Sequence, residues 1–125
     1  MLVEVKRSRS VVRLNALRDY HIAVADLAEQ QLVDIAQWYA DRNPAGVDHF
    51  VEALERFRAN LTKNPRMGRA RPELLERLRS WPIHPWIVYY SISEHERRVD
   101  IEAVYHGAMD IDSDDFSEED ADEDS

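Results

Sequence analysis

The sequence predicts an α+β fold in which an N-terminal strand and an antiparallel helical hairpin pack on a small antiparallel β-sheet. Three observations lead to this prediction. Apolar residues recur at helical spacing over residues 26–61, they alternate or run continuously over residues 86–105, and an Asn-Pro pair divides the helical part in two. With 125 residues, 44% of them hydrophobic, the chain fits one domain with one core.

The first two elements are expected to be a short strand and a helix. In residues 20–24 the larger side chains Tyr20, Ile22 and Val24 alternate with His21 and Ala23, as in a short strand. Asp26 is a suitable N-cap, and Glu29 follows three residues later, close to a capping box. The helix is expected to end near Arg42. Its apolar residues at helical spacing are Ala28, Leu32, Ile35, Ala36 and Tyr39.

The second helix is predicted to follow almost without a loop. Asn43 is expected to be its N-cap and Pro44 its first residue, where the missing N–H of proline does no harm. Two amphipathic helices joined so tightly indicate an antiparallel hairpin. The predicted apolar stripe of the second helix consists of Val47, Phe50, Val51, Leu54, Phe57 and Leu61.

Three strands are predicted after the hairpin. Residues 79–84 suit an edge strand, because Pro82 and Pro85 cannot donate to a ladder. Residues 86–93 are apolar on both faces and should be central. Residues 98–105 alternate cleanly, which places four apolar residues on one face: Val99, Ile101, Ala103 and Tyr105.

The charge is unevenly distributed along the chain. Ten of the 25 acidic residues lie in residues 110–125, which contain no Lys or Arg, so the remainder is almost neutral despite a net charge of -9. We therefore expect a basic N-terminal arm (1–18), a folded domain (19–110) and an acidic disordered tail (111–125). The tail is interpreted as a solubility appendage. The alternative is that it screens basic residues of its own chain.

Several classes of function are disfavoured by composition. The absence of cysteine excludes disulfides and thiolate metal sites and fits a reducing cytoplasm. No apolar stretch approaches the roughly 20 residues that span a bilayer. There is no glycine-rich phosphate loop, and the histidines lack paired metal-ligand spacing, so no cofactor and no metal are expected. The five histidines are His21, His49, His84, His95 and His106.

The stretch NPRMGRARPEL, residues 64–74, is the strongest candidate for function. Arg66, Arg69 and Arg71 surround Gly68 on a connecting loop, and guanidinium groups suit bidentate recognition of carboxylate or phosphate. The alternative is a solvated loop whose arginines pair with nearby glutamates. Trp81 and Trp86, near the predicted edge strand, either bind a partner or pack in the core. Tyr105 and His106 either act as an acid–base pair or have a purely structural role.

Five segments in order resemble ParE-type toxins of the RelE/ParE superfamily over about residues 20–110. They are ADLAEQQLVDIAQWYADRNP, NPRMGRARPEL, LRSWPI, WIVYYSI and VDIEAVYHGAMD. The resemblance implies a type II toxin that a cognate antitoxin neutralises. ParE-like members are similar to inhibitors of DNA gyrase, whereas RelE-like relatives are ribosome-dependent mRNA endonucleases.

The resemblance favours the ParE-like activity over the nuclease. Nuclease-type members usually carry an arginine in the central strand, where this chain has Ile87, so a cation that would stabilise transition-state charge is missing. We therefore predict a gyrase-binding toxin without catalysis of its own and without direct nucleic-acid contact. The predicted partner-binding residues are Arg66, Arg69, Arg71, Arg79, Trp81, Trp86 and His106.

Two alternatives remain open. In an mRNA endoribonuclease acting on the ribosome, the catalytic residues would be Arg79, Tyr105 and His106, helped by the loop arginines. In a non-toxic module, the domain would only bind its antitoxin. Two departures from the family pattern suggest the latter: Met109 stands where an arginine is usual, and His84-Pro85 replaces Gly-Arg before the central strand.

Overall fold

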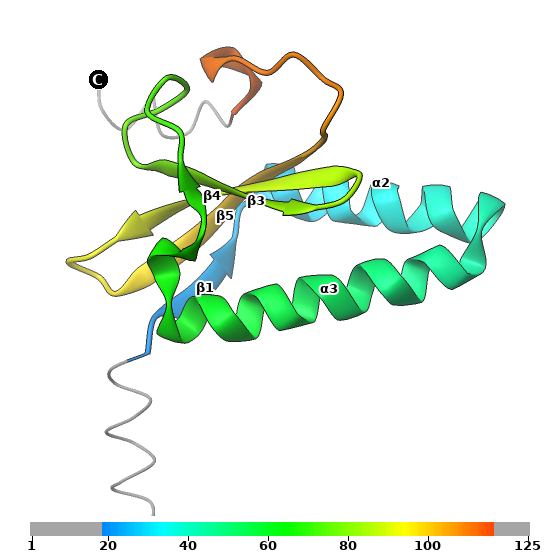
Figure 1. Cartoon of the computed structure of the whole chain (residues 1–125), viewed down its shortest axis with the longest axis horizontal. Coiled ribbons are helices and arrows are strands. Elements are labelled where there is room, and N and C mark those ends of the chain that lie inside the picture. The colour runs from blue at the N-terminus through cyan, green and yellow to red at the C-terminus, as the bar shows by residue number, and fades with distance from the viewer. Residues whose placement is uncertain (1–18, 117–125) are drawn as a thin grey trace, which may run out of the picture.

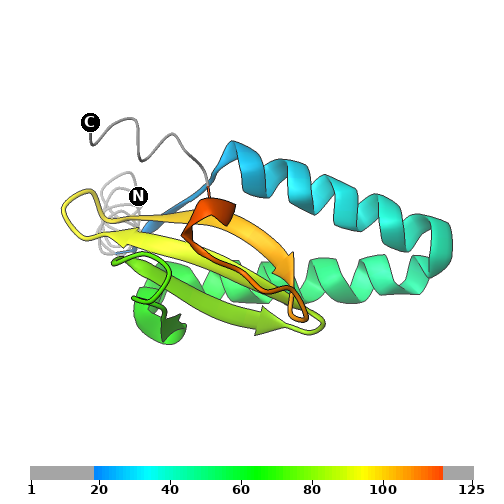
Figure 2. The same cartoon turned by 90° about the horizontal axis from the view of Figure 1, so that it is seen from above.

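A five-stranded sheet carries two long helices on one of its faces (Figures 1 and 2). The computed structural model describes residues 19–116, so the predictions for residues 1–18 and 117–125 lie outside the described residues. The elements are β1 (His21–Val24), α2 (Asp26–Arg42), α3 (Pro44–Lys63), η1 (Pro65–Met67), β2 (Arg69–Ala70), β3 (Leu78–Ile83), β4 (Trp86–Ser93), β5 (Arg98–His106) and η2 (Ser113–Asp115).

The sheet order is β1-β5-β4-β3-β2, with β4 in the centre as predicted. β1 pairs with β5 in parallel, whereas the other neighbours are antiparallel. The α+β class and the helical hairpin are confirmed, but the sheet is mixed rather than purely antiparallel. The two-residue strand β2 was not predicted. It covers only the start of β3, so β3 is an edge strand only from Trp81 onward.

The hairpin begins one residue earlier than predicted. Asp26 is already helical, and the N-cap is Ala25, whose N–H donates to the carbonyl of Ile101 at 2.9 Å. Asn43 does precede Pro44 at the start of α3, yet its side chain makes no capping hydrogen bond. Its backbone N–H instead donates to the carbonyl of Tyr39 at 2.6 Å and closes α2. Neither of the two predicted side-chain caps is therefore formed.

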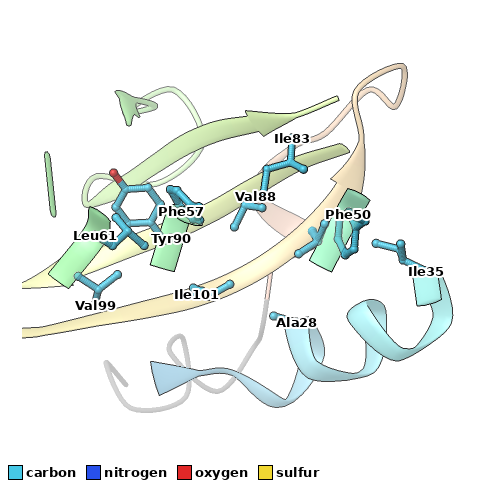
Figure 3. Close-up of a cluster of buried hydrophobic side chains, with 11 residues drawn as sticks. Ala28, Ile35, Phe50, Phe57, Leu61, Ile83, Val88, Tyr90, Val99 and Ile101 are labelled. Atoms are coloured by element: carbon cyan, nitrogen blue, oxygen red, sulfur yellow. The ribbon is translucent and has the colours of Figure 1, made fainter. Parts of the chain in front are cut away.

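The core beneath the hairpin is built from both helices and three strands (Figure 3). Leu61 and Tyr90 are fully buried within it. Val51, which we predicted in the apolar stripe, is 45% exposed. It follows the buried Phe50 directly, and a step of one residue turns a side chain by about 100° round the helix, away from the sheet. The buried members are Ala28, Ile35, Phe50, Phe57, Leu61, Ile83, Val88, Tyr90, Val99, Ile101 and Val104.

A β-bulge changes which residues of β5 face the helices. Tyr90 pairs with Ile101 and Tyr89 pairs with Ala103, so Glu102 is an extra residue between two successive pairs. An extra residue of this kind inverts the alternation of side chains beyond it.

The bulge corrects the predicted single face of the last strand. Val99 and Ile101 pack beneath the helices as expected, but Ala103 and Tyr105 lie on the opposite face. Val104 takes the place beneath the helices. Because both faces of the strand end are apolar here, the sequence pattern alone could not reveal the inversion.

The opposite face is covered by two irregular segments, residues 71–77 and residues 111–116. Phe116 is 6% exposed and packs edge-on against Tyr89 with ring centroids 5.3 Å apart. The described chain therefore stays folded beyond Asp110, where we had placed the start of a disordered tail. The second core cluster consists of Leu74, Leu78, Tyr89, Ala103 and Phe116.

Local capping explains why acidic residues fold here. The Asp112 carboxylate accepts from the backbone N–H of Asp114 at 2.9 Å, and the Asp115 carboxylate accepts from that of Asp112 at 2.9 Å. These bonds form a capping box at η2 and orient Phe116 toward the sheet. The acidic composition that predicted disorder thus supplies caps in residues 112–115.

Candidate partner-binding surface

The arginine loop, residues 64–74, is attached to the sheet by a buried tyrosine. The hydroxyl of Tyr90 accepts from the backbone N–H of Gly68 at 2.8 Å and donates to the carbonyl of Pro65 at 2.7 Å. Tyr90 is fully buried on the central strand β4, and burial raises the pKa of its hydroxyl. The loop backbone is therefore held by the rigid part of the fold rather than left to solvent.

Gly68 is required by the close approach of the loop to the sheet. A Cβ at this position would lie 2.6 Å from the Tyr90 hydroxyl and 2.7 Å from the carbonyl oxygen of Ser80. Both distances are shorter than any normal contact, so a larger residue would push the loop off the strand. Gly68 therefore serves the close packing of the loop on the sheet.

Arg79 contributes to the same anchoring. Its guanidinium donates to the carbonyls of Gly68 at 2.7 Å and of Arg66 at 3.3 Å. It lies on β3 opposite Ala70 of β2. This arginine, predicted as a partner-binding or catalytic residue, is placed to hold the loop in shape.

The three loop arginines differ in how far they are neutralised. Arg66 forms an ion pair with Glu94, in the turn between β4 and β5. Arg71 donates to Glu73 at 2.6 Å; this bond lowers the pKa of the Glu73 carboxyl and raises the pKa of Arg71. Arg69 is exposed and makes no hydrogen bond or ion pair with any residue from 19 to 116. Of the three loop arginines, Arg69 is therefore the one whose charge is least neutralised by a carboxylate.

Arg69 and Arg71 line a hollow of about 440 Å³ at the β2–β3 edge of the sheet, which Ile87 borders from the face opposite the helices and Trp81 from the helical face. Arg71 also donates to the hydroxyl of Ser80 at 3.3 Å, and its guanidinium lies 5.8 Å from the ring centre of Tyr89. Ile87 supplies part of the apolar wall. The hollow combines two guanidinium groups, a hydroxyl and an apolar floor, which suits an acidic peptide segment.

A second depression, of about 390 Å³, lies between α3 and the free edge of β3. Trp81 forms part of its wall and stacks on Phe57 with ring centroids 5.9 Å apart and an angle of 11°. The indole N–H of Trp86 donates to the hydroxyl of Tyr39 at 3.0 Å. Both predicted tryptophans thus pack against the core, whereas Trp38 is 46% exposed on the hairpin.

The proposed catalytic residues are not brought together. His106 lies opposite Trp86 on β4, whereas Arg79 lies opposite Tyr90, on the strand at the other side of β4. The Nδ1 atom of His106 accepts from the backbone N–H of Ala108 at 3.0 Å. Tyr105 donates to the carbonyl of Asp115, and burial raises the pKa of its hydroxyl. Within residues 19–116 these groups form no acid–base pair.

Three residues that hold this surface or its neighbouring segments in place were missed from the sequence. Tyr90 was assigned only to a central strand, although a tyrosine expected to be buried usually has a hydrogen-bond partner for its hydroxyl. Phe116 was assigned to a disordered tail, although an isolated aromatic after a run of potential caps could have marked a folded turn. Glu94, the partner of Arg66, carries no such signal because the pairing joins residues 28 positions apart.

The fold and the surface together define a small α+β domain, with a helical hairpin on one sheet face and a basic hollow at the sheet edge. The chain belongs to the family described as the ParE toxin of the type II toxin–antitoxin system parDE, which matches residues 22–111. Among solved structures it is similar to a chain of the chromosomal ParDE toxin–antitoxin system from P. aeruginosa. The TM-score is 0.58 at 14% identity, over 71% of this chain and 97% of that one.

No curated protein matches the chain. At 14% identity, the structural similarity concerns the fold alone. Neither helix in the described part of the chain has the length and apolar character that a bilayer crossing requires.

Proposed function

We propose that this toxin-family chain halts growth by binding DNA gyrase in the cytoplasm, and that a cognate antitoxin neutralises it by covering the arginine loop. The observation that carries the proposal is the loop itself. Its backbone is fixed by Tyr90 and Arg79, while the Arg69 side chain is exposed and forms no ion pair among residues 19–116. A fixed backbone that presents exposed guanidinium groups, one of them outside any ion pair, suits recognition, because little ordering is needed on binding.

The chemistry of the two depressions suggests what a partner would present. Carboxylates suit Arg69 and Arg71, and apolar side chains suit the wall formed by Trp81 and Phe57. Both depressions are lined by Met67 and Trp81, so one extended partner segment can contact both. We therefore expect the antitoxin to use a segment that mixes acidic and apolar residues.

A supercoiling assay with purified protein tests the target. We expect inhibition of gyrase at micromolar protein, and weaker inhibition by the double variant Arg69→Ser/Arg71→Ser. The matched control is Arg42→Ser/Arg58→Ser, which removes the same charge from the helical hairpin. Undiminished supercoiling at micromolar wild-type protein would show that gyrase is not the target.

An mRNA endonuclease is the weaker candidate. Ile87 occupies the central-strand position of the nuclease-type arginine, and Arg79 is engaged by loop carbonyls rather than directed at His106 or Tyr105. Without a cation beside an acid–base pair, transition-state charge would go unstabilised. Primer extension after induced expression checks this; codon-linked cuts would favour the nuclease over the gyrase inhibitor.

A non-toxic antitoxin-binding module is supported by one exposed residue. Met109 is 51% exposed at the position where the family pattern has an arginine. If that arginine is needed for toxicity, Met109→Arg should increase growth inhibition. Induction with and without the adjacent open reading frame separates the two possibilities, since a module without toxicity leaves growth unchanged in both cases.

A further inference from the structure

The arginine hollow has two guanidinium groups beside one carboxylate, Glu73, and it lies within reach of the end of the described chain. Arg69 makes no ion pair inside residues 19–116, and the only carboxylate among them that pairs with Arg71 is Glu73. The side chain of Arg71 remains 22% exposed. A hollow with two guanidinium groups and one carboxylate can accept further carboxylates.

Phe116 fixes the last described residue beside this hollow. The ring of Tyr89 lies between the two: its centroid is 5.8 Å from Cζ of Arg71 and 5.3 Å from the ring centroid of Phe116. Tyr105 binds the carbonyl of Asp115 and holds the same segment from its other side. Residues 71–77, in green, and residues 111–116, in orange to red, lie on the same side of the sheet in Figure 1.

The sequence that follows Phe116 is complementary in charge. Residues 117–125 contain six acidic residues and no Lys or Arg. Nine residues reach at most about 30 Å when extended. This length is sufficient to reach Arg71, because only the ring of Tyr89 separates Phe116 from its guanidinium. A short tether gives an effective concentration on the order of 1 mM, so even a contact with a Kd of about 1 mM would be half occupied.

We infer that acidic residues 118–124 dock on Arg69 and Arg71 of the same molecule and cover the hollow. The docking itself does not depend on the proposed function. Its consequence does: the tail would compete with an acidic segment of the partner, which must displace it to bind. The contact is electrostatic and lies at the surface, so it weakens with salt as the Debye length falls from about 8 Å at 0.15 M to about 3 Å at 1 M.

A spin label tests the contact without any partner. The chain has no cysteine, so Ala121→Cys provides a unique attachment site for a nitroxide. We expect the label to broaden the amide NMR signals of residues 69–71 and 80 at low salt, and this broadening to fall several-fold at 1 M salt. A control tail keeps its length but loses its charge through Glu118→Gln, Glu119→Gln, Asp120→Asn, Asp122→Asn, Glu123→Gln and Asp124→Asn.

The control tail separates docking from simple tethering, because both tails hold the label at the same distance along the chain. Arg69→Ser/Arg71→Ser should reduce the broadening of residue 80 as the control tail does, and Arg42→Ser/Arg58→Ser should leave it unchanged. Equal broadening with the native and control tails would overturn the inference.

A trans ligand tests the competition. Hexaglutamate peptide is expected to bind a chain ending at Phe116 about three- to tenfold more tightly than the full chain, in line with one or two surface ion pairs. The Arg69→Ser/Arg71→Ser change should remove this difference. Equal affinity for the two chains contradicts the competition. These outcomes do not depend on gyrase, so they remain informative if the gyrase proposal fails.

Discussion

The two faces of the sheet are covered in different ways. One face lies beneath a hairpin of two regular helices and contributes most of the buried apolar residues. The other is covered by residues 71–77 and 111–116, irregular segments that bury a smaller cluster around Tyr89 and Phe116. The basic hollow opens at the sheet edge beside this second face, with Arg71 and Ile87 in its lining. We therefore expect the helix-covered face to contribute most of the stability, and the surface formed by the loops to serve recognition.

The largest expected effect tests the helix-covered face. Leu61 is fully buried between α3 and the sheet. Leu61→Ala should lower the free energy of unfolding by about 3 kcal/mol, through lost burial and a residual cavity. Urea denaturation measures this loss. A change below about 1 kcal/mol would mean that the hairpin is not the main source of stability.

The next effect tests the link between the faces. Tyr90→Phe removes the hydroxyl that bonds Gly68 and Pro65, leaving buried backbone groups without a partner. We expect a loss of about 2 kcal/mol, with faster hydrogen exchange at the Gly68 amide. Tyr20→Phe is the matched control, because the hydroxyl it removes binds Glu94 at an exposed site. Equal losses for the two variants would argue against anchoring by Tyr90.

A smaller effect is expected on the loop-covered face. Phe116→Ala should cost only about 1 kcal/mol, although the ring is almost buried, because residues 111–116 can detach while the rest stays folded. Tyr89 and Tyr105 would then become more exposed, which tyrosine fluorescence and proteolysis near residue 112 can detect. A loss as large as that of Leu61→Ala would show that both faces form one cooperative unit.

The smallest effect is a pH dependence in the arginine loop. Because Arg71 lowers the pKa of Glu73 below its ordinary 4.5, the bond stabilises the fold above that pH, and this contribution is lost as the pH falls through the lowered pKa. Glu73→Gln should therefore reduce Tm slightly at pH 7 but not at strongly acidic pH. Glu76→Gln is a neighbouring control. A Tm difference that does not change with pH would contradict this assignment.

The face beneath the helices was predictable because its signals are periodic. The spacing of Phe50, Phe57 and Leu61 and the Asn43–Pro44 break define the hairpin without reference to the rest of the fold. The central place of β4 followed from its continuous apolar run. These signals are local, so a single sequence contains them.

The second face was not predictable because it depends on contacts between distant residues. The bulge at Glu102 exchanges the faces of β5 within an apolar run, and nothing in the alternation marks it. The packing of Phe116 on Tyr89 joins residues far apart in the chain. The arginine loop was found from its composition, but its attachment to Tyr90 required knowledge of the register of β4.

The attachment of the arginine loop has a consequence for how the surface can change over evolutionary time. The bonds from Tyr90 and Arg79 reach backbone atoms of residues 65–68, not side chains. The side chain at position 69 can therefore be exchanged without loosening the scaffold, and an exchange at position 66 removes only the exposed ion pair with Glu94. New partner pairs can diverge by small steps from a common ancestor, with cross-recognition lost at a few exposed positions while the framework around Gly68 stays fixed.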